Sequence, residues 1–306
     1  WSASASRIGQ PAFSNSIHYI QHSMPAQRLP LTTPSRLLAV VLTLCAATSQ
    51  AQPLEEVPFV TSPDNVTLEM LNSAGVKKGD HVIDLGSGDG RIVILAAKRF
   101  EATGLGVEID PRLVEKSKAN ARDAGVADKA EFREQDLFKT DLSPATVITM
   151  YLLTEVNLAL RPSILALKPG TRIVSHDWDM GDWAPDRTTV VDVPNKSVGR
   201  EKSSKIHFWT VPAKVDGLWC GGGLFKGASI RLTQKYETFD GTLAFRDRTR
   251  ELKGTINGTE LRTPAGDNGE LVLQATGDAL RIASAQGGLA LAQGQSFQRA
   301  AGNSCS

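Results

Sequence analysis

The chain has 306 residues, of which 22% are charged and 41% are apolar, and its formal net charge is +1. These proportions are typical of a soluble globular protein with one or two domains. The nearly balanced charge and an aromatic content of only 6% argue against a nucleic-acid partner, because such a surface needs excess positive charge or stacking rings.

The first part of the chain has the pattern of a secretory signal. Arginines precede an apolar run at 37–47, and the small residues Ser49 and Ala51 flank a cleavage site after Ala51. The run is shorter than the about 20 residues of a membrane-spanning helix. We therefore predict an upstream extension and signal peptide over 1–51, no transmembrane span in the mature chain, and export to the periplasm or medium. If the signal is not used, the protein is cytoplasmic.

Alternating helical and strand patterns follow, from about residue 64 to residue 211. This alternation predicts an α/β fold with a doubly wound, mostly parallel sheet and helices on both faces. Ligands of such sheets bind outside the carboxyl ends of the strands. The predicted helices are 65–76, 90–100, 111–126 and 155–170, and the predicted strands are 81–85, 104–109, 130–135, 145–153, 171–176, 188–193 and 205–211.

Helical periodicity ends after Pro212, where short alternating stretches separated by turn residues begin. They predict a β-meander, as a small barrel or sandwich. The domains are therefore expected at 52–212 and 213–306. The predicted strands of the second are 229–237, 241–246, 250–256, 259–263, 270–275, 279–284, 288–293 and 296–300.

Two of the three cysteines, Cys220 and Cys305, lie beyond the signal. An exported protein can join them in a disulfide, and two unpaired thiols are the alternative. No Cys/His cluster has the spacing of a metal site, so no metal is predicted.

The segment DLGSGDGRIV at 84–93 decides between two kinds of nucleoside ligand. A dinucleotide-binding turn reads G-x-G-x-x-G and offers backbone N–H groups to pyrophosphate. Here the third glycine comes one residue early, and Asp84 and Asp89 flank the turn, where each carboxylate would repel a phosphate by about a kcal/mol or more. The loop therefore favours S-adenosylmethionine (SAM), which is cationic and has no phosphate, and disfavours an NAD-dependent dehydrogenase.

The next two strand ends also carry carboxylates. Glu108 can accept hydrogen bonds from both ribose hydroxyls, as acidic residues do in NAD sites too. Asp136 can accept from the adenine amino group or can instead cap the following turn. Asp110 stands before Pro111 and is expected to cap a helix. Three such loops at successive strand ends indicate a nucleoside site.

The motifs DLGSGDGRIVI, GVEIDP, EQDLF and LKPGTRIVSHDWDMGDW resemble those of class I SAM-dependent methyltransferases. They are most similar to small bacterial proteins related to the lysine methyltransferases that modify a mitochondrial ATP synthase subunit. The resemblance covers about 56–211 and implies seven strands in the order 3-2-1-4-5-7-6, with 205–211 antiparallel. The cofactor contacts that it implies are Thr61, Asp84, Gly86, Ser87, Gly88, Glu108, Asp136 and Leu137.

The acceptor side is less specific in sequence. Tyr151 ends the fourth strand, where it faces the transferred methyl group or packs in the core. Asp177 follows the fifth strand, beside His176, which is either a general base or a structural residue. We predict methyl transfer from SAM to an unidentified protein or small-molecule acceptor, with a protein lysine or another amine favoured. The alternative is an exported methyltransferase-like binding module without turnover, and the sequence leaves the oligomeric state open.

Overall fold

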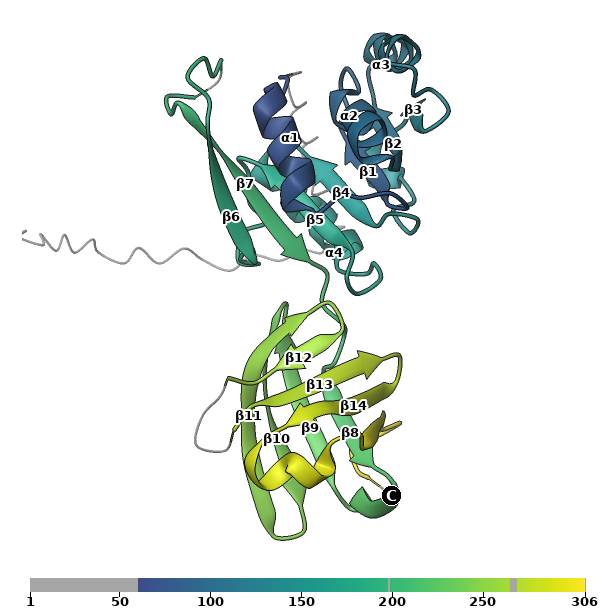
Figure 1. Ribbon diagram of the computed structural model, residues 1–306. Coiled ribbons are helices and arrows are strands. Elements are labelled where there is room, and N and C mark those ends of the chain that lie inside the picture. The colour runs from purple at the N-terminus through teal and green to yellow at the C-terminus, as the bar shows by residue number, and fades with distance from the viewer. Residues whose placement is uncertain (1–59, 198, 265–268, 306) are drawn as a thin grey trace, which may run out of the picture. The chain divides into compact units, whose positions relative to one another are not determined.

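The computed structural model describes residues 60–197, 199–264 and 269–305. The predicted signal at 1–51 therefore lies outside the described residues. In chain order, a helix-covered sheet precedes a barrel of strands (Figure 1). The proposed division of the chain at 51 and 212 stays a prediction.

The sheet has the predicted order β3-β2-β1-β4-β5-β7-β6. Strands β1 to β5 run parallel, whereas β7 pairs antiparallel with both β5 and β6. The doubly wound sheet and its late antiparallel pair are thus confirmed. Its strands are β1 His81–Leu85, β2 Thr103–Glu108, β3 Ala130–Glu134, β4 Val147–Met150, β5 Arg172–His176, β6 Arg187–Asp192 and β7 Ser203–Thr210.

Helices cover both faces of the sheet because successive strand residues point to opposite sides. Val82 packs with residues of α1 and α2, whereas its neighbour Ile83 packs with residues of α4. Asp110 accepts a hydrogen bond from the backbone N–H of Arg112, which confirms it as the N-cap of α3. The helices are α1 Asp64–Ser73, α2 Arg91–Phe100, α3 Pro111–Asp123 and α4 Thr154–Ile164, with a 3₁₀ turn η1 at Leu137–Lys139.

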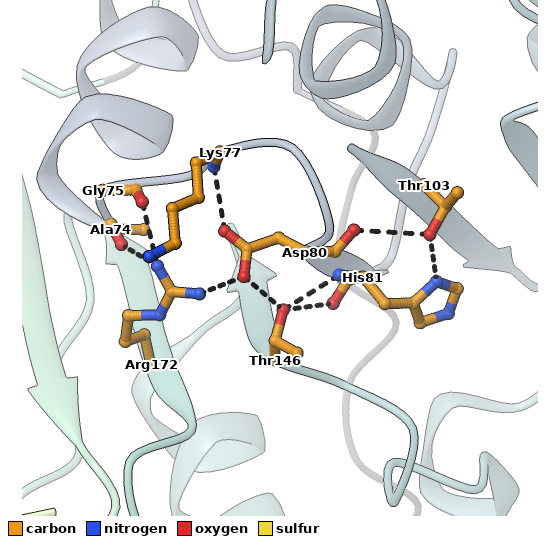
Figure 2. Close-up of polar contacts among 8 residues, drawn as sticks. All are labelled: Ala74, Gly75, Lys77, Asp80, His81, Thr103, Thr146 and Arg172. Atoms are coloured by element: carbon orange, nitrogen blue, oxygen red, sulfur yellow. Dashed lines mark hydrogen bonds and ion pairs between the residues drawn. The ribbon is translucent and has the colours of Figure 1, made fainter. Parts of the chain in front are cut away.

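A polar network joins the amino ends of β1, β2, β4 and β5 to the end of α1 (Figure 2). Buried Asp80 pairs with Arg172 and accepts hydrogen bonds from the Lys77 backbone and the Thr146 hydroxyl, each at 2.9 Å. Burial opposes the ionisation of Asp80, but these donors outweigh it and hold its pKa below the ordinary value. Arg172 also donates to two carbonyls at the end of α1. The network therefore fixes the edge of the sheet opposite the predicted ligand site.

The β-meander closes into an antiparallel barrel in the order β10-β11-β12-β13-β14-β15-β8-β9. Its interior is filled by Trp219, Phe239, Phe297 and aliphatic side chains. The strands are β8 Gly217–Gly221, β9 Ser229–Lys235, β10 Thr238–Phe245, β11 Arg248–Asn257, β12 Glu260–Arg262, β13 Leu271–Thr276, β14 Ala279–Ala285 and β15 Ser296–Arg299, and 3₁₀ turns are η2 Gly223–Phe225 and η3 Gly287–Ala292.

The barrel corrects one predicted strand and adds another. Residues 288–293 were expected to be extended, but they lie largely in η3, and Leu291 is 94% exposed. The reason is pairing: β14 already lies between β13 and β15, which leaves this segment no neighbouring strand. The additional strand is β8, which closes the barrel between β15 and β9.

Cys220 of β8 and Cys305 are joined by a disulfide, which is one of the two alternatives that the sequence left open. No helix in the described part of the chain is long and apolar enough to cross a membrane.

Candidate active site

A cavity of about 620 Å³ opens at the carboxyl ends of the parallel strands. Its size falls within the range of about 300–1,000 Å³ that is usual for small-molecule sites. Every predicted cofactor residue lines it, and so does Tyr151: Thr61, Asp84, Gly86, Ser87, Gly88, Glu108, Asp136 and Leu137. The structure thus brings these residues together, while their individual roles stay predictions.

The turn between β1 and α2 forms one wall of the cavity. The backbone N–H groups of Gly86 and Ser87 both donate to the carbonyl of Val107, at 3.0 and 2.9 Å, which ties the turn to β2. Gly86 has a φ of +75°, a conformation that favours glycine. The Ser87 hydroxyl is buried and has no hydrogen-bond partner among the described residues. It is therefore a polar group that a ligand in this cavity can satisfy.

Gly90 serves packing and does not line the cavity. Its φ is +81°, and an added Cβ would lie 2.6 Å from the ring of Phe132 and 2.8 Å from Ser117. A side chain at this position would force α2 away from the sheet. The third glycine of the motif thus allows close helix packing, as it does in dinucleotide folds.

Asp84 is a buried carboxyl at the cavity wall. It accepts a hydrogen bond of 2.7 Å from the Thr149 hydroxyl. Burial above all raises its pKa to about 7, and the negative charges of Glu108 and Asp89 act in the same direction. A cationic ligand beside Asp84 would lower this pKa again, because an opposite charge favours the ionised form of the carboxyl.

The carboxylate of Asp89 is engaged within the protein, in contrast to the expectation from its sequence position. It accepts from Nε and Nη2 of Arg91 at 3.0 and 2.8 Å, and Arg91 also donates to the carbonyl of Ser62 at 2.8 Å. The charge of Asp89 is thus balanced by Arg91. Asp84 thus lacks the cationic partner that Asp89 has, and Asp89 orients Arg91, which holds the segment before α1 through the carbonyl of Ser62.

Glu108 and Asp136 both line the cavity, and their contacts with ribose and adenine stay predictions. Glu108 accepts from the backbone N–H of Gly88 at 3.0 Å through one oxygen and from Ile109 at 2.8 Å through the other. Asp136 accepts from the backbone of Phe138 at 2.9 Å and so caps η1, while it also lines the cavity. Capping and ligand contact are therefore compatible for Asp136.

A smaller chamber of about 170 Å³ adjoins the cofactor cavity. The two share Val60, Thr61 and Tyr151, so Tyr151 stands at their junction. Its ring stacks on His176 with centroids 3.9 Å apart. Burial above all raises the pKa of Tyr151, so its hydroxyl stays protonated at neutral pH.

His176 is held rigidly in the wall of this chamber. Its Nδ1 lies 2.8 Å from the Ser62 hydroxyl, and its Nε2 lies 2.8 Å from the Ser204 hydroxyl. Burial lowers its pKa to about 4, despite the nearby Asp177. A neutral ring with both nitrogens engaged favours the structural alternative over a general base.

Asp177 lies behind the small chamber and not at the cofactor cavity. It has a φ of +62°, which is uncommon outside glycine. One carboxylate oxygen accepts from the Lys205 backbone at 2.8 Å, and the other lies 2.6 Å from Nζ of Lys196. The two predicted catalytic residues are thus separated: Tyr151 faces both cavities, and Asp177 is screened by a lysine.

Comparison with known proteins identifies this arrangement. A family model of the ANTKMT methyltransferase domain matches residues 84–187. The protein-lysine N-methyltransferase of Saccharolobus islandicus (strain REY15A) is 43% identical over 141 residues, which are 45% of this chain and 88% of that protein. The chain belongs to the SAM-dependent methyltransferases. The residues of the β1–α2 turn that line the cavity, and the Ser87 hydroxyl that has no partner among the described residues, fit SAM as the cofactor of this chain.

Other methyltransferases match in part. The adenine nucleotide translocase lysine N-methyltransferase of Mus musculus is 30% identical over 131 residues, 42% of this chain and 57% of that protein. The chain therefore spans little more than half the length of that relative. A Salinibacter ruber RNA methyltransferase, solved with S-adenosyl-L-homocysteine, is 51% identical and covers 51% of this chain and 96% of that chain, with a TM-score of 0.46.

Several residues of the methyltransferase site carried no signal in its sequence. Thr149 holds Asp84 but is one β-branched residue within an apolar strand. Arg91 is two residues from Asp89, but the sequence does not determine that the two side chains pair with each other. Lys196 comes from the segment between β6 and β7, and its place beside the small chamber depends on tertiary structure.

Proposed function

We propose that the enzyme transfers the methyl group of SAM to the side-chain amine of a protein lysine. The observation that carries this proposal is the 43% identity to a protein-lysine N-methyltransferase across 88% of that protein. The mouse relative also acts on a lysine, by its name. The Salinibacter ruber relative is described as acting on RNA, so the acceptor class must be tested.

The site suits an in-line displacement. SAM supplies an electrophilic methyl group on a sulfonium, and the acceptor nitrogen must approach it to about 3–3.5 Å along the carbon–sulfur axis. The protein's part is to hold the cofactor through the β1–α2 turn, to exclude water and to admit the amine beside Tyr151. The amine must lose its proton before it attacks the methyl group, because the ammonium form has no lone pair.

The acceptor class is tested by incubating the full chain with methyl-labelled SAM and whole-cell extract. Parallel samples are treated with protease or with ribonuclease before the labelled material is precipitated. We expect the label to be lost on proteolysis, to resist ribonuclease, and to be recovered as ε-methylated lysine by mass spectrometry. Label that is released by ribonuclease would contradict the lysine acceptor.

Export of the mature enzyme is part of the same proposal. It is supported by the signal-like sequence before residue 52 and by the disulfide, because such bonds persist in oxidising compartments and are rare in the cytosol. Cells quenched in acid and treated with a large maleimide provide the test. Cys220 and Cys305 should react only after reduction, and their reaction without it would contradict export.

A further inference from the structure

The small chamber beside the cofactor cavity has a lysine of the chain itself in its wall. Only 12% of the Lys196 side chain is exposed. Its ammonium lies 2.6 Å from a carboxylate oxygen of Asp177 and donates to the carbonyl of Ser203 at 2.7 Å. The chamber wall therefore already contains a bound alkylammonium of the kind that a lysine acceptor would present.

The position and size of the chamber suit an acceptor side chain. It meets the cofactor cavity at Val60, Thr61 and Tyr151. Its volume of about 170 Å³ is well below the about 300–1,000 Å³ of sites that enclose a whole small molecule. A single slender chain that enters here would reach the cofactor past Tyr151.

The negative charge of Asp177 would favour a cation in the chamber if the Lys196 side chain moved away. His176 is bound by two serines. Asp177 is the carboxylate that pairs with Lys196, and a hydrogen bond from the Lys205 backbone fixes its orientation. Asp177 does not line the chamber while Lys196 covers it. Rotation of the Lys196 side chain would present this carboxylate to an incoming ammonium group.

We propose that the chamber is the acceptor-amine subsite, that Asp177 binds the ammonium group of the acceptor, and that Lys196 occupies the subsite as an intramolecular mimic. The inference rests on the proposed function, since it takes the acceptor to be an alkylamine. Exchange of one ammonium for another keeps the partly buried carboxylate paired throughout. The acceptor ammonium then releases its proton to solvent water, its nitrogen bonds to the methyl carbon, and the carbon–sulfur bond breaks with its electron pair left on the sulfur.

The first test removes the mimic. Lys196→Met keeps most of the side-chain length but loses the charge, and Lys98→Met, at an exposed lysine of α2, is the control. Denatured extract protein and labelled SAM serve as substrates. We expect Lys196→Met to lower the apparent KM for protein by about three- to tenfold, because the competing state is removed. The Kd for SAM should not change, and the control should match the wild type.

An unchanged KM in Lys196→Met would overturn the inference. So would a loss of activity in a variant whose melting curve shows that it is folded, because Lys196 would then assist the reaction.

The second test needs no turnover. Binding of n-butylammonium is followed by NMR, and Lys196→Met should bind it at least about tenfold more tightly than the wild type. Adding Asp177→Asn, which keeps an oxygen for the Lys205 backbone, should abolish the gain. If n-butylammonium binds as expected but no lysine is methylated, the proposed function fails and the subsite stands. If lysines are methylated and neither test shows a change, the subsite fails and the function stands.

Discussion

Asp80 and Asp84 lie at the two ends of β1, and the protein treats these two buried carboxyls in opposite ways. Asp80 is met by Arg172, a backbone N–H and the Thr146 hydroxyl, and its pKa is lowered (Figure 2). Asp84 accepts from Thr149, but the charges acting on it are negative, and burial raises its pKa to about 7. The buried carboxyl at the amino ends of the strands has a cationic partner, and the one at the carboxyl ends has none among the described residues.

This difference distinguishes a carboxylate that stabilises the fold, Asp80, from one that we expect to bind a ligand, Asp84. A buried carboxylate with a complete set of donors contributes to stability as long as its partners remain. A buried carboxyl without a counter-ion costs stability and persists where a ligand supplies the missing charge. The amino edge of the sheet therefore holds the fold together, and we predict that the carboxyl edge binds the cation of SAM.

The largest expected effect is at Asp80. Asp80→Asn leaves the mostly buried Arg172 without its counter-ion and should lower the free energy of unfolding by about 3 kcal/mol. Urea unfolding at pH 7 measures the loss, and titration of the folded variant should give the wild-type Kd for SAM. A variant of normal stability with weakened SAM binding would show that the two edges are not distinct.

Asp84→Asn should have the opposite effect on stability. The folded pKa of about 7 lies above the unfolded value of 3.8, so the contribution of Asp84 is full below pH 4 and is lost as pH rises through 7. At pH 8 the ligand-free variant should therefore be more stable than the wild type by about 2 kcal/mol. The gain should vanish near pH 4. A destabilised variant at pH 8 would contradict an uncompensated charge at this position.

The affinity for SAM should depend on pH through the same carboxyl. Below pH 7 Asp84 holds a proton that a cationic ligand must displace, so the affinity should rise about tenfold between pH 6 and pH 8. Calorimetry at the two pH values measures this change. The Asp84→Asn variant controls for titration of SAM itself, and an equal pH dependence in the variant would exclude Asp84 as the cause.

Glu108→Gln should give the smallest change, because the amide keeps an oxygen for the Gly88 backbone and the bond lost to the Ile109 backbone is exposed to water. Loss of the charged acceptor should weaken SAM binding by about fivefold and leave stability within about 0.5 kcal/mol. Glu134→Gln, at the exposed end of β3, is the matched control and should bind SAM normally. Equal losses in both variants would point to general electrostatics and not to a ribose contact.

The sheet and the cofactor loop could be predicted because local sequence determines them. Strand and helix periodicity indicated the layers, and the positions of Asp84 and Glu108 at strand ends placed both at one edge. Parallel strands bring their carboxyl ends together whatever the detail of packing. The resemblance to methyltransferases supplied the strand order, which periodicity alone does not determine.

Features that depend on side-chain pairing or strand closure could not be predicted in this way. The balance of Asp89 by Arg91 is a choice of rotamer, and the small chamber is assembled from residues far apart in the sequence, such as Thr61 and Lys196. The turn η3 has an alternating pattern like that of a strand, but the barrel offers it no partner. Whether a segment finds a neighbouring strand depends on the strand order of the whole barrel and not on the pattern of the segment itself.

The comparison of Asp80 with Asp84 is tested most directly by calorimetric titration at pH 8. The wild type, Asp80→Asn and Asp84→Asn are each titrated with SAM and, separately, with NADH. We predict that SAM binds the wild type and Asp80→Asn with the same affinity, that Asp84→Asn binds it at least about tenfold more weakly, and that NADH does not bind. Binding of NADH alone, or equal SAM affinity in all three proteins, would contradict a carboxyl edge prepared for a cationic nucleoside.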